Sequence, residues 1–267
     1  MNQLPNTTQA QNKPPEKIFQ QRGIYLLPNL LTTAALFAGF YAIVAAMQSH
    51  FEIAAIAIFV AMVADGLDGR VARMTNTQTA FGAQYDSLSD MVAFGVAPAL
   101  VMFNWSIFSL GKLGWLAAFL YTAATALRLA RFNTQVPDKR YFQGLPCPAA
   151  AGVLASTVWM GSAFASKGTL FAIPLALFTI LIATLMVSTI RYSSFKTIDF
   201  KGRVPFFTIV TAVFLIAAIA LEPAEMLFSL FLIYALAGPV LTLWQLHKVR
   251  KHKAEHRTHH SHKGHQL

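Results

Sequence analysis

Charged residues are scarce in this sequence, and cysteine is almost absent. Only 12% of the 267 residues are charged, whereas 55% are hydrophobic. A soluble domain carries roughly 25% charged residues, so this composition excludes an ordinary soluble globular protein. The single cysteine, Cys147, excludes a disulfide framework and a cysteine-rich metal site. Because no soluble domain is left to carry a binding face, we expect no interaction with nucleic acid, despite the net charge of +10.

Most of the sequence consists of long apolar runs. A membrane-spanning helix needs about 20 consecutive apolar residues. The sequence therefore predicts an all-α fold, a polytopic integral membrane bundle of about eight transmembrane helices. The predicted spans are residues 27–48, 52–73, 84–104, 113–133, 148–166, 169–190, 205–221 and 225–246. We expect Asn104, Trp105 and Trp115 to act as anchors at the membrane interface, where amphipathic side chains gather.

The basic residues predict the topology. Cytoplasmic segments of membrane proteins carry an excess of lysine and arginine. If the N-terminus is cytoplasmic and eight spans alternate, 19 of the 21 lysines and arginines lie on that side, and only Lys112 and Lys167 lie opposite. We therefore expect both termini to be cytoplasmic. The basic loops, and the lack of a recognisable signal or transit peptide, favour a bacterial inner (plasma) membrane.

Polar segments stand at both ends of the chain. Residues 1–17 are predicted to be disordered, because they are rich in proline, glutamine and asparagine. Residues 247–267 form a basic tail that holds seven of the eight histidines. We interpret this tail as a solvated cytoplasmic segment that touches anionic lipid, with metal binding as the alternative. Between these ends, we expect a core in residues 18–204 and two additional C-terminal transmembrane helices in residues 205–246.

Four of the six aspartates lie close together, within residues 65–90. Asp65 and Asp68 are three residues apart, and Asp86 and Asp90 are four apart, so on helices each pair would share one face. A carboxylate near a bilayer is costly, so we expect a functional role and a nearby partner. Because the loop between the second and third spans is short, the two helices should be antiparallel neighbours with all four acids at one depth.

Four converging carboxylates predict a site for hard cations. The acids would repel one another unless cations or protons neutralise them, and oxygen ligands suit magnesium, manganese or calcium better than zinc. Two divalent ions would suit a pyrophosphate substrate, with Asp90 as general base for an alcohol nucleophile. One part of the second span carries almost no side chains, because its residues are Gly66, Gly69 and Ala72. Such a surface allows another helix to approach closely, or it leaves room for a nucleotide.

The aspartates belong to the pattern D-x2-D-G-x2-A-R-x8-G-x3-D-x3-D, which is complete in residues 65–90. This pattern resembles the signature of the CDP-alcohol phosphotransferases, integral membrane enzymes that move a phosphoryl-linked alcohol from a cytidine diphosphate carrier to a second alcohol. The resemblance implies a six-helix catalytic core within residues 18–204 and two divalent cations, Mg²⁺ or Mn²⁺. It also implies metal ligation by Asp65, Asp68, Asp86 and Asp90, catalysis by Asp90, and CDP binding by Asp68, Gly69, Ala72, Arg73 and Gly82.

Further motifs resemble one branch of this family. They are LLPNLLTTAALFAGFYAI near the start, DSLSDMVAFGVAPAL, ALRLARFN at 126–133 and FQGLPCPAAAG at 142–152. This branch transfers a phosphatidyl group from CDP-diacylglycerol to L-serine and releases CMP, and we also expect a homodimer surrounded by membrane lipids. Glycerol 3-phosphate, inositol phosphate and choline stay open as alternative acceptors. A cation-coupled transporter is the remote alternative, because the acids lie at one interface and not at the midplane.

Three arginines are candidate ligands for the acceptor or the lipid phosphate. Serine carries a carboxylate and the phosphatidyl phosphate is anionic, so cationic side chains should face the site. Arg128 and Arg131 are expected at the end of the fourth span, and Arg191 at the end of the sixth. Arginine binds a carboxylate or phosphate through two parallel hydrogen bonds. The alternative is that these side chains only extend to the membrane interface.

Overall fold

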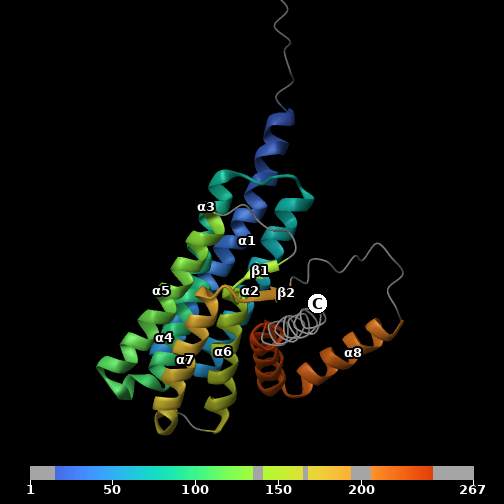
Figure 1. Ribbon diagram of the computed structural model, residues 1–267. Helices are drawn as coiled ribbons and strands as arrows, with labels where there is room; N and C mark the ends of the chain where they lie inside the picture. The colour runs from blue at the N-terminus through green and yellow to red at the C-terminus, as the bar shows by residue number, and fades with distance from the viewer. Residues whose placement is uncertain (1–15, 135–140, 165–167, 194–205, 243–267) are drawn as a thin grey trace, which may run out of the picture.

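Helices occupy all eight segments predicted from hydropathy. The computed structural model describes residues 16–134, 141–164, 168–193 and 206–242, so most of the N-terminal segment and nearly all of the basic tail lie outside the described residues. Figure 1 shows a bundle of long helices from which one C-terminal helix, α8, projects sideways. The helices are α1 (Glu16–Met47), α2 (Phe51–Met74), α3 (Ala80–Asp90), α4 (Ala97–Trp105), α5 (Lys112–Thr134), α6 (Cys147–Phe164), α7 (Ala172–Val187), α8 (Phe206–Leu221) and a last helix, Pro223–Thr242.

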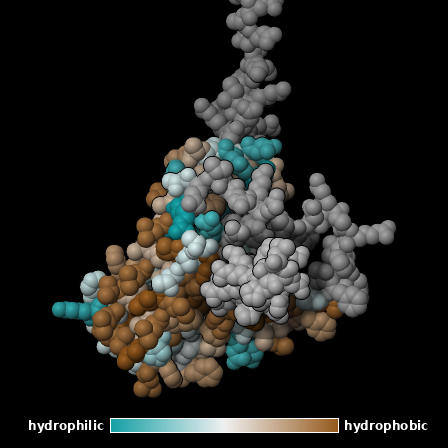
Figure 2. All heavy atoms as spheres, viewed as in Figure 1, coloured by the Kyte–Doolittle hydropathy of each residue, from teal (hydrophilic) through white to brown (hydrophobic). Residues whose placement is uncertain are grey.

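Six helical segments in the described part of the chain are long and apolar enough to cross a membrane. They are Leu27–Met47, Ala80–Trp105, Lys112–Thr134, Cys147–Phe164, Thr169–Val187 and Pro223–Thr242. The other two predicted spans correspond to α2, which carries the first aspartate pair, and to α8, which has 16 residues. Hydrophobic side chains cover much of the bundle, and hydrophilic ones gather at the end where α2 and α3 are connected (Figure 2). The prediction of a polytopic helical membrane protein is confirmed.

A π-helical segment lies directly after the aspartates of α3. Residues Met91–Val96 form this segment, η1, which joins α3 to α4 in one continuous span. Pro98 has no N–H group, so it cannot donate the α-helical hydrogen bond to the carbonyl of Phe94. The buried hydroxyl of Tyr121, on α5, donates to this carbonyl instead at 3.1 Å. Tyr121 therefore ties α5 to the segment that follows Asp90.

Replacing Tyr121 by phenylalanine should lower the free energy of unfolding by about 1–3 kcal/mol, because the Phe94 carbonyl stays buried without this donor. The change can be measured by unfolding the purified protein with SDS in mixed micelles. The exposed Tyr41, on α1, provides the matched control, and Tyr41→Phe should leave stability unchanged. Equal stability of Tyr121→Phe and the wild type would contradict this role for Tyr121.

Small residues allow the helices of the core to approach closely. A Cβ atom added at Gly39, on α1, would lie 2.6 Å from the Cα of Ala93 in η1. A Cβ atom added at Gly152, on α6, would lie 2.6 Å from the ring of Phe231. Phe231 belongs to the helix Pro223–Thr242 and also stacks near Phe59 of α2, with ring centroids 5.9 Å apart. The last helix is therefore packed against the core, unlike α8.

A two-stranded antiparallel ribbon was not predicted. Its strands are β1 (Tyr141–Gln143) and β2 (Arg191–Ser193), and Phe142 pairs with Tyr192. Gly144 follows β1 with a φ of +76°, a conformation that favours glycine, and its N–H donates to the carbonyl of Ile190 at 2.9 Å. Strands of three residues are too short to give a recognisable alternation in the sequence.

Trp105 is the last residue of the span Ala80–Trp105, but the prediction that its side chain anchors the protein in the membrane interface is wrong. Its side chain is only 4% exposed. The indole ring occupies the space left by the missing side chains of Gly161 and Gly168, which lie directly against it. These two glycines are more than 50 residues away along the chain, so a local sequence pattern does not reveal the packing. Trp115, by contrast, is exposed.

Candidate active site

The two acidic helices both pack against α1 and have little direct contact with each other. Asp65 and Asp68 lie in the second half of α2, and Asp86 and Asp90 lie in α3. A short turn joins the helices, and the side chain of Thr79 caps α3 by accepting a hydrogen bond from the N–H of Gly82 at 2.9 Å. The chain therefore reverses direction at the connection between α2 and α3, which lies at one end of the bundle (Figure 1).

The aspartate side chains converge. Asp65, Asp68 and Asp86 each offer a carboxylate oxygen, and these oxygens all lie within 4.8 Å of one another. The carboxyl group of Asp90 forms a hydrogen bond with that of Asp65. Carboxylates at this separation repel one another unless a proton or a cation lies between them. The fourth aspartate thus lies beside the group of three.

The chemistry of this cluster fits hard divalent cations. Oδ1 of Asp86 is buried and has no hydrogen-bond partner in the described part of the chain. Within the same residues, no lysine or arginine is paired with any of the four carboxylates. A buried carboxylate oxygen without a partner is costly, and several such ligands can be stabilised together by Mg²⁺ or Mn²⁺. The residues present therefore suit a metal site.

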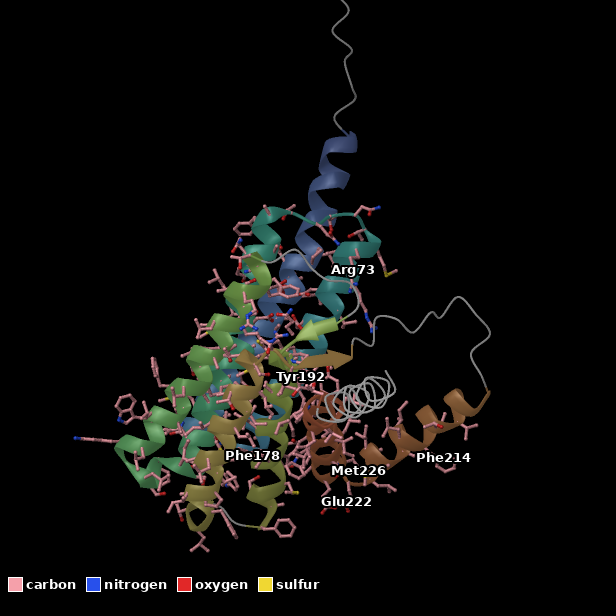
Figure 3. The ribbon with its side chains drawn as sticks, in the orientation of Figure 1. Arg73, Phe178, Tyr192, Phe214, Glu222 and Met226 are labelled. Atoms are coloured by element: carbon pink, nitrogen blue, oxygen red, sulfur yellow. The ribbon has the colours of Figure 1, made fainter. Side chains whose placement is uncertain are left out.

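The bare face of α2 is open. A Cβ atom added at Gly66 or Gly69 would meet no atom of the described residues within 4 Å, so neither glycine serves close approach to a described helix. The sequence left two alternatives for these glycines, close helix approach or room for a nucleotide. The structure favours the second, because space lies beside the helix at both positions among the described residues. Arg73 lies in the last turn of α2 (Figure 3), where its Nε donates to the carbonyl of Gly69 at 2.7 Å. Its other guanidinium nitrogens have no hydrogen-bond acceptor among the described residues.

Arg128 and Arg131 lie on one face of α5, and each has a nitrogen without a hydrogen-bond partner among the described residues. Arg128 donates from Nη1 to Sγ of Cys147 at 3.3 Å, and Arg131 donates from Nη2 to the carbonyl of Val187 at 2.9 Å. Nε of Arg128 and Nη1 of Arg131 are buried without an acceptor among the described residues. Cys147 also lies near enough to Asp90 for the two groups to interact electrostatically. Arg128 therefore lies near the aspartate cluster, and Arg131 lies one turn further along the same face of α5.

The third candidate arginine, Arg191, is in β2 and not at the end of a helix. Its backbone lies opposite Gln143 of β1, and its side chain lies outside the described part of the structure. The next residue, Tyr192, is buried, and its hydroxyl donates to the carbonyl of Ala235 at 3.0 Å (Figure 3). Burial, together with the neighbouring Tyr234, raises the pKa of Tyr192 to about 12, so this donor stays protonated at neutral pH.

Two features near the site were missed in the sequence. The first is Thr32 of α1, whose hydroxyl is bonded to Asp68. The second is the last helix, where Tyr234 lies 5.8 Å from Tyr192 between ring centroids and interacts electrostatically with Arg128. Thr32 is part of LLPNLLTTAALFAGFYAI, one of the motifs that resemble the family. A polar residue within this apolar helix could have indicated a role near the site. Tyr234 carried no such signal.

Comparison with known proteins gives consistent matches. The profile of the family described as CDP-alcohol phosphatidyltransferase matches residues 25–180, which include all four clustered aspartates. A CDP-diacylglycerol--serine O-phosphatidyltransferase from Helicobacter pylori (strain ATCC 700392 / 26695) is 36% identical over 216 residues, 80% of this chain and 90% of that protein. A protein of the same name from Methanocaldococcus jannaschii is 34% identical over 221 residues, 83% of this chain and 96% of that protein.

Proposed function

Because this chain belongs to the CDP-alcohol phosphatidyltransferase family, we propose that it transfers a phosphatidyl group from CDP-diacylglycerol to the hydroxyl group of L-serine. The products are phosphatidylserine and CMP. The observation that carries this proposal is the convergence of Asp65, Asp68 and Asp86, together with two arginines that have nitrogens without a partner in the described part of the chain. The names of the similar proteins support serine as the acceptor.

We assign the aspartates to the handling of the diphosphate. Asp65, Asp68 and Asp86 would hold two divalent cations, Mg²⁺ or Mn²⁺, with Asp90 as a further ligand or as a neighbour. Bound cations of this kind neutralise phosphate oxygens and a leaving phosphate during in-line displacement. Oδ1 of Asp86 is buried without a hydrogen-bond partner among the described residues. A bound cation would therefore stabilise this carboxylate more than the other three.

Asp90 is the proposed general base. Its carboxylate would accept the proton of the serine hydroxyl as the serine oxygen forms a bond to the phosphorus of the phosphatidyl group. The bond between this phosphorus and the bridging oxygen of the diphosphate breaks, and CMP leaves with that oxygen. Asp90 suits the role because it lies at the edge of the cluster, bonded to Asp65 and outside the group of three converging carboxylates.

The open face of α2 is the proposed site for the CDP group. Gly69 and Ala72 lie along this face, Asp68 lies beside it on the side that is buried against α1, and Gly82 is in the first turn of α3. The absence of a Cβ at Gly69 lets a ligand approach the backbone, since nothing lies within 4 Å of that position. Arg73, already bonded to the Gly69 carbonyl through Nε, would offer its remaining guanidinium nitrogens to phosphate.

Arg128 and Arg131 are the proposed ligands of the serine carboxylate or the lipid phosphate, with Arg191 as a third candidate. Removing either of the first two, by Arg128→Gln or Arg131→Gln, should raise KM for serine or CDP-diacylglycerol by about 10–100-fold, because a charge-assisted hydrogen bond contributes about 1.5–3 kcal/mol. Steady-state kinetics with each substrate varied in turn would show which anion each arginine binds.

Lys112 provides the control for these variants, because it is an exposed cation at the opposite end of α5. Lys112→Gln should change neither KM. Unchanged KM values in both arginine variants would contradict substrate binding by these arginines. Their role would then be limited to membrane topology or helix packing.

The acceptor is tested directly with labelled serine, CDP-diacylglycerol and Mg²⁺ or Mn²⁺, followed by identification of the labelled lipid. We expect phosphatidylserine in the lipid phase and an equal amount of CMP. Glycerol 3-phosphate, inositol phosphate and choline, supplied separately, are the controls for other acceptors. Turnover with one of these and none with serine would refute the serine assignment, and no lipid product with any acceptor would refute the transferase proposal.

We also propose that the site faces the cytoplasm, since 19 of the 21 lysines and arginines lie on that side in the predicted topology. Inverted inner-membrane vesicles should therefore use added CDP-diacylglycerol and serine without detergent, whereas right-side-out vesicles should not. The homodimer stays a prediction, which mass photometry of the protein in nanodiscs can test.

A further inference from the structure

We propose that Thr32 of α1 is a positioning residue that sets the orientation of the Asp68 carboxylate. The inference rests on the proposed function for the role of Asp68 as a metal ligand. Oγ1 of Thr32 donates a hydrogen bond to Oδ2 of Asp68 at 2.6 Å. Both residues are buried, with 4% of Thr32 and 5% of Asp68 exposed. Water therefore does not readily replace this contact.

The geometry favours the carboxylate as the acceptor. A hydroxyl has one hydrogen, and Oγ1 of Thr32 also lies 3.1 Å from the carbonyl oxygen of Pro28 in its own helix. The contact with Asp68 is 0.5 Å shorter and joins the hydroxyl to a charged group, so it is the stronger of the two. With Oδ2 held, rotation of the carboxyl group is restricted, and the direction of Oδ1 is set as well.

Thr32 is also connected to the second acidic helix. The hydroxyl of Ser89 donates to the backbone carbonyl of Thr32 at 3.0 Å, and Ser89 is 2% exposed. Ser89 directly precedes Asp90 on α3. One residue of α1 therefore contacts both acid-bearing helices, which have little contact with each other. We infer that α1 fixes the relative positions of the two aspartate pairs through Thr32.

The adjacent threonine makes a different contact. Thr33 bonds to the carbonyl of Asn29 at 2.7 Å and to the hydroxyl of Tyr85 at 2.9 Å, both on the exposed side of the helix. Thr33 thus touches α3 but none of the four aspartates. Residues that orient a metal ligand typically change metal affinity by about 10–100-fold when they are replaced. Thr32 should have this effect, and Thr33 should not.

The test measures Mn²⁺ binding to the purified full-length protein in nanodiscs, by the loss of the electron paramagnetic resonance signal of free Mn²⁺. Thr32→Val, which keeps the shape but removes the hydroxyl, should weaken Mn²⁺ binding by about 10–100-fold. Thr32→Ser keeps a hydroxyl that can donate to Asp68, so it should bind Mn²⁺ within about threefold of the wild type.

Thr179 of α7 provides a matched control for the loss of a buried hydroxyl. It is fully buried, and its hydroxyl donates only within its own helix, to the carbonyl of Leu175 at 2.8 Å. Thr179→Val should therefore leave Mn²⁺ affinity unchanged. Ser89→Ala removes the hydrogen bond to the Thr32 carbonyl but leaves Asp68 and its bond to Thr32 in place. It should weaken Mn²⁺ binding, though less than Thr32→Val. This variant tests the role of Thr32 if Thr32→Val does not fold.

Two outcomes separate this inference from the proposed function. Wild-type affinity in Thr32→Val, or equally weak binding in Thr32→Ser and Thr32→Val, would overturn the role of Thr32 while leaving the metal site intact. No Mn²⁺ binding by the wild-type protein would overturn the metal site itself, and the role of Thr32 with it.

Discussion

Asp90→Asn should lower kcat by about 10²–10⁴-fold while the protein stays folded and continues to bind Mn²⁺. Asparagine has nearly the same shape as aspartate, but it cannot accept the proton of the acceptor hydroxyl. Asp90 is bonded to Asp65 and is not one of the three carboxylates that converge most closely. Its amide replacement can still donate a hydrogen bond to Asp65, so the remaining ligands should keep their positions.

The measurement compares turnover with Mn²⁺ binding in the same preparation of Asp90→Asn. A loss of turnover at unchanged metal affinity supports the role of Asp90 as a base. A parallel loss of metal affinity would instead identify Asp90 chiefly as a ligand, and full activity would refute both roles. KM for CDP-diacylglycerol should change little, because the base acts on the acceptor.

Asp86→Asn should lower turnover by about 10³-fold or more and also weaken Mn²⁺ binding. The reason is that bound divalent cations contribute several kcal/mol to charge stabilisation, and each 1.36 kcal/mol corresponds to tenfold in rate. Asp86 is a sensitive position because its buried Oδ1 has no alternative partner among the described residues. An amide at this position has less charge to offer a cation.

Glu52 offers the matched control for Asp86→Asn, because it is an exposed acid at the opposite end of α2. Glu52→Gln should leave turnover and Mn²⁺ binding unchanged. Treatment of the wild-type protein with EDTA should abolish turnover to the same extent as Asp86→Asn, and added Mg²⁺ or Mn²⁺ should restore it. Undiminished turnover after complete chelation would contradict a metal-dependent reaction.

The sequence predicts those features of the site that depend on residues close together in the chain. The spacings of three and four residues place each aspartate pair on one helical face, and the short turn brings the two pairs to the same end of the bundle. The choice of hard cations follows from oxygen ligands alone. The residue pattern across 65–90 also indicated the family, and the family match extends over residues 25–180.

The sequence did not reveal which helix supports the aspartates. α2 and α3 both pack mainly on α1, and α2 contacts the third span through η1 and α4 more than through α3. Hydrophobic periodicity states which face of a helix is apolar, but it does not state which neighbour covers that face. The same limit explains why Trp105 was expected at the interface, although Gly161 and Gly168 make room for it inside the bundle.

The sequence by itself determined the helices, the membrane class and the acidic chemistry, because each depends on residues within a few positions of one another. Tertiary structure alone decided the contacts that orient the site. Thr32 and Asp68 are 36 residues apart in the chain, and Thr32 and Ser89 are 57 apart. Contacts at such separations form only when whole helices pack, since many weak interactions along the full length of each helix fix its position together.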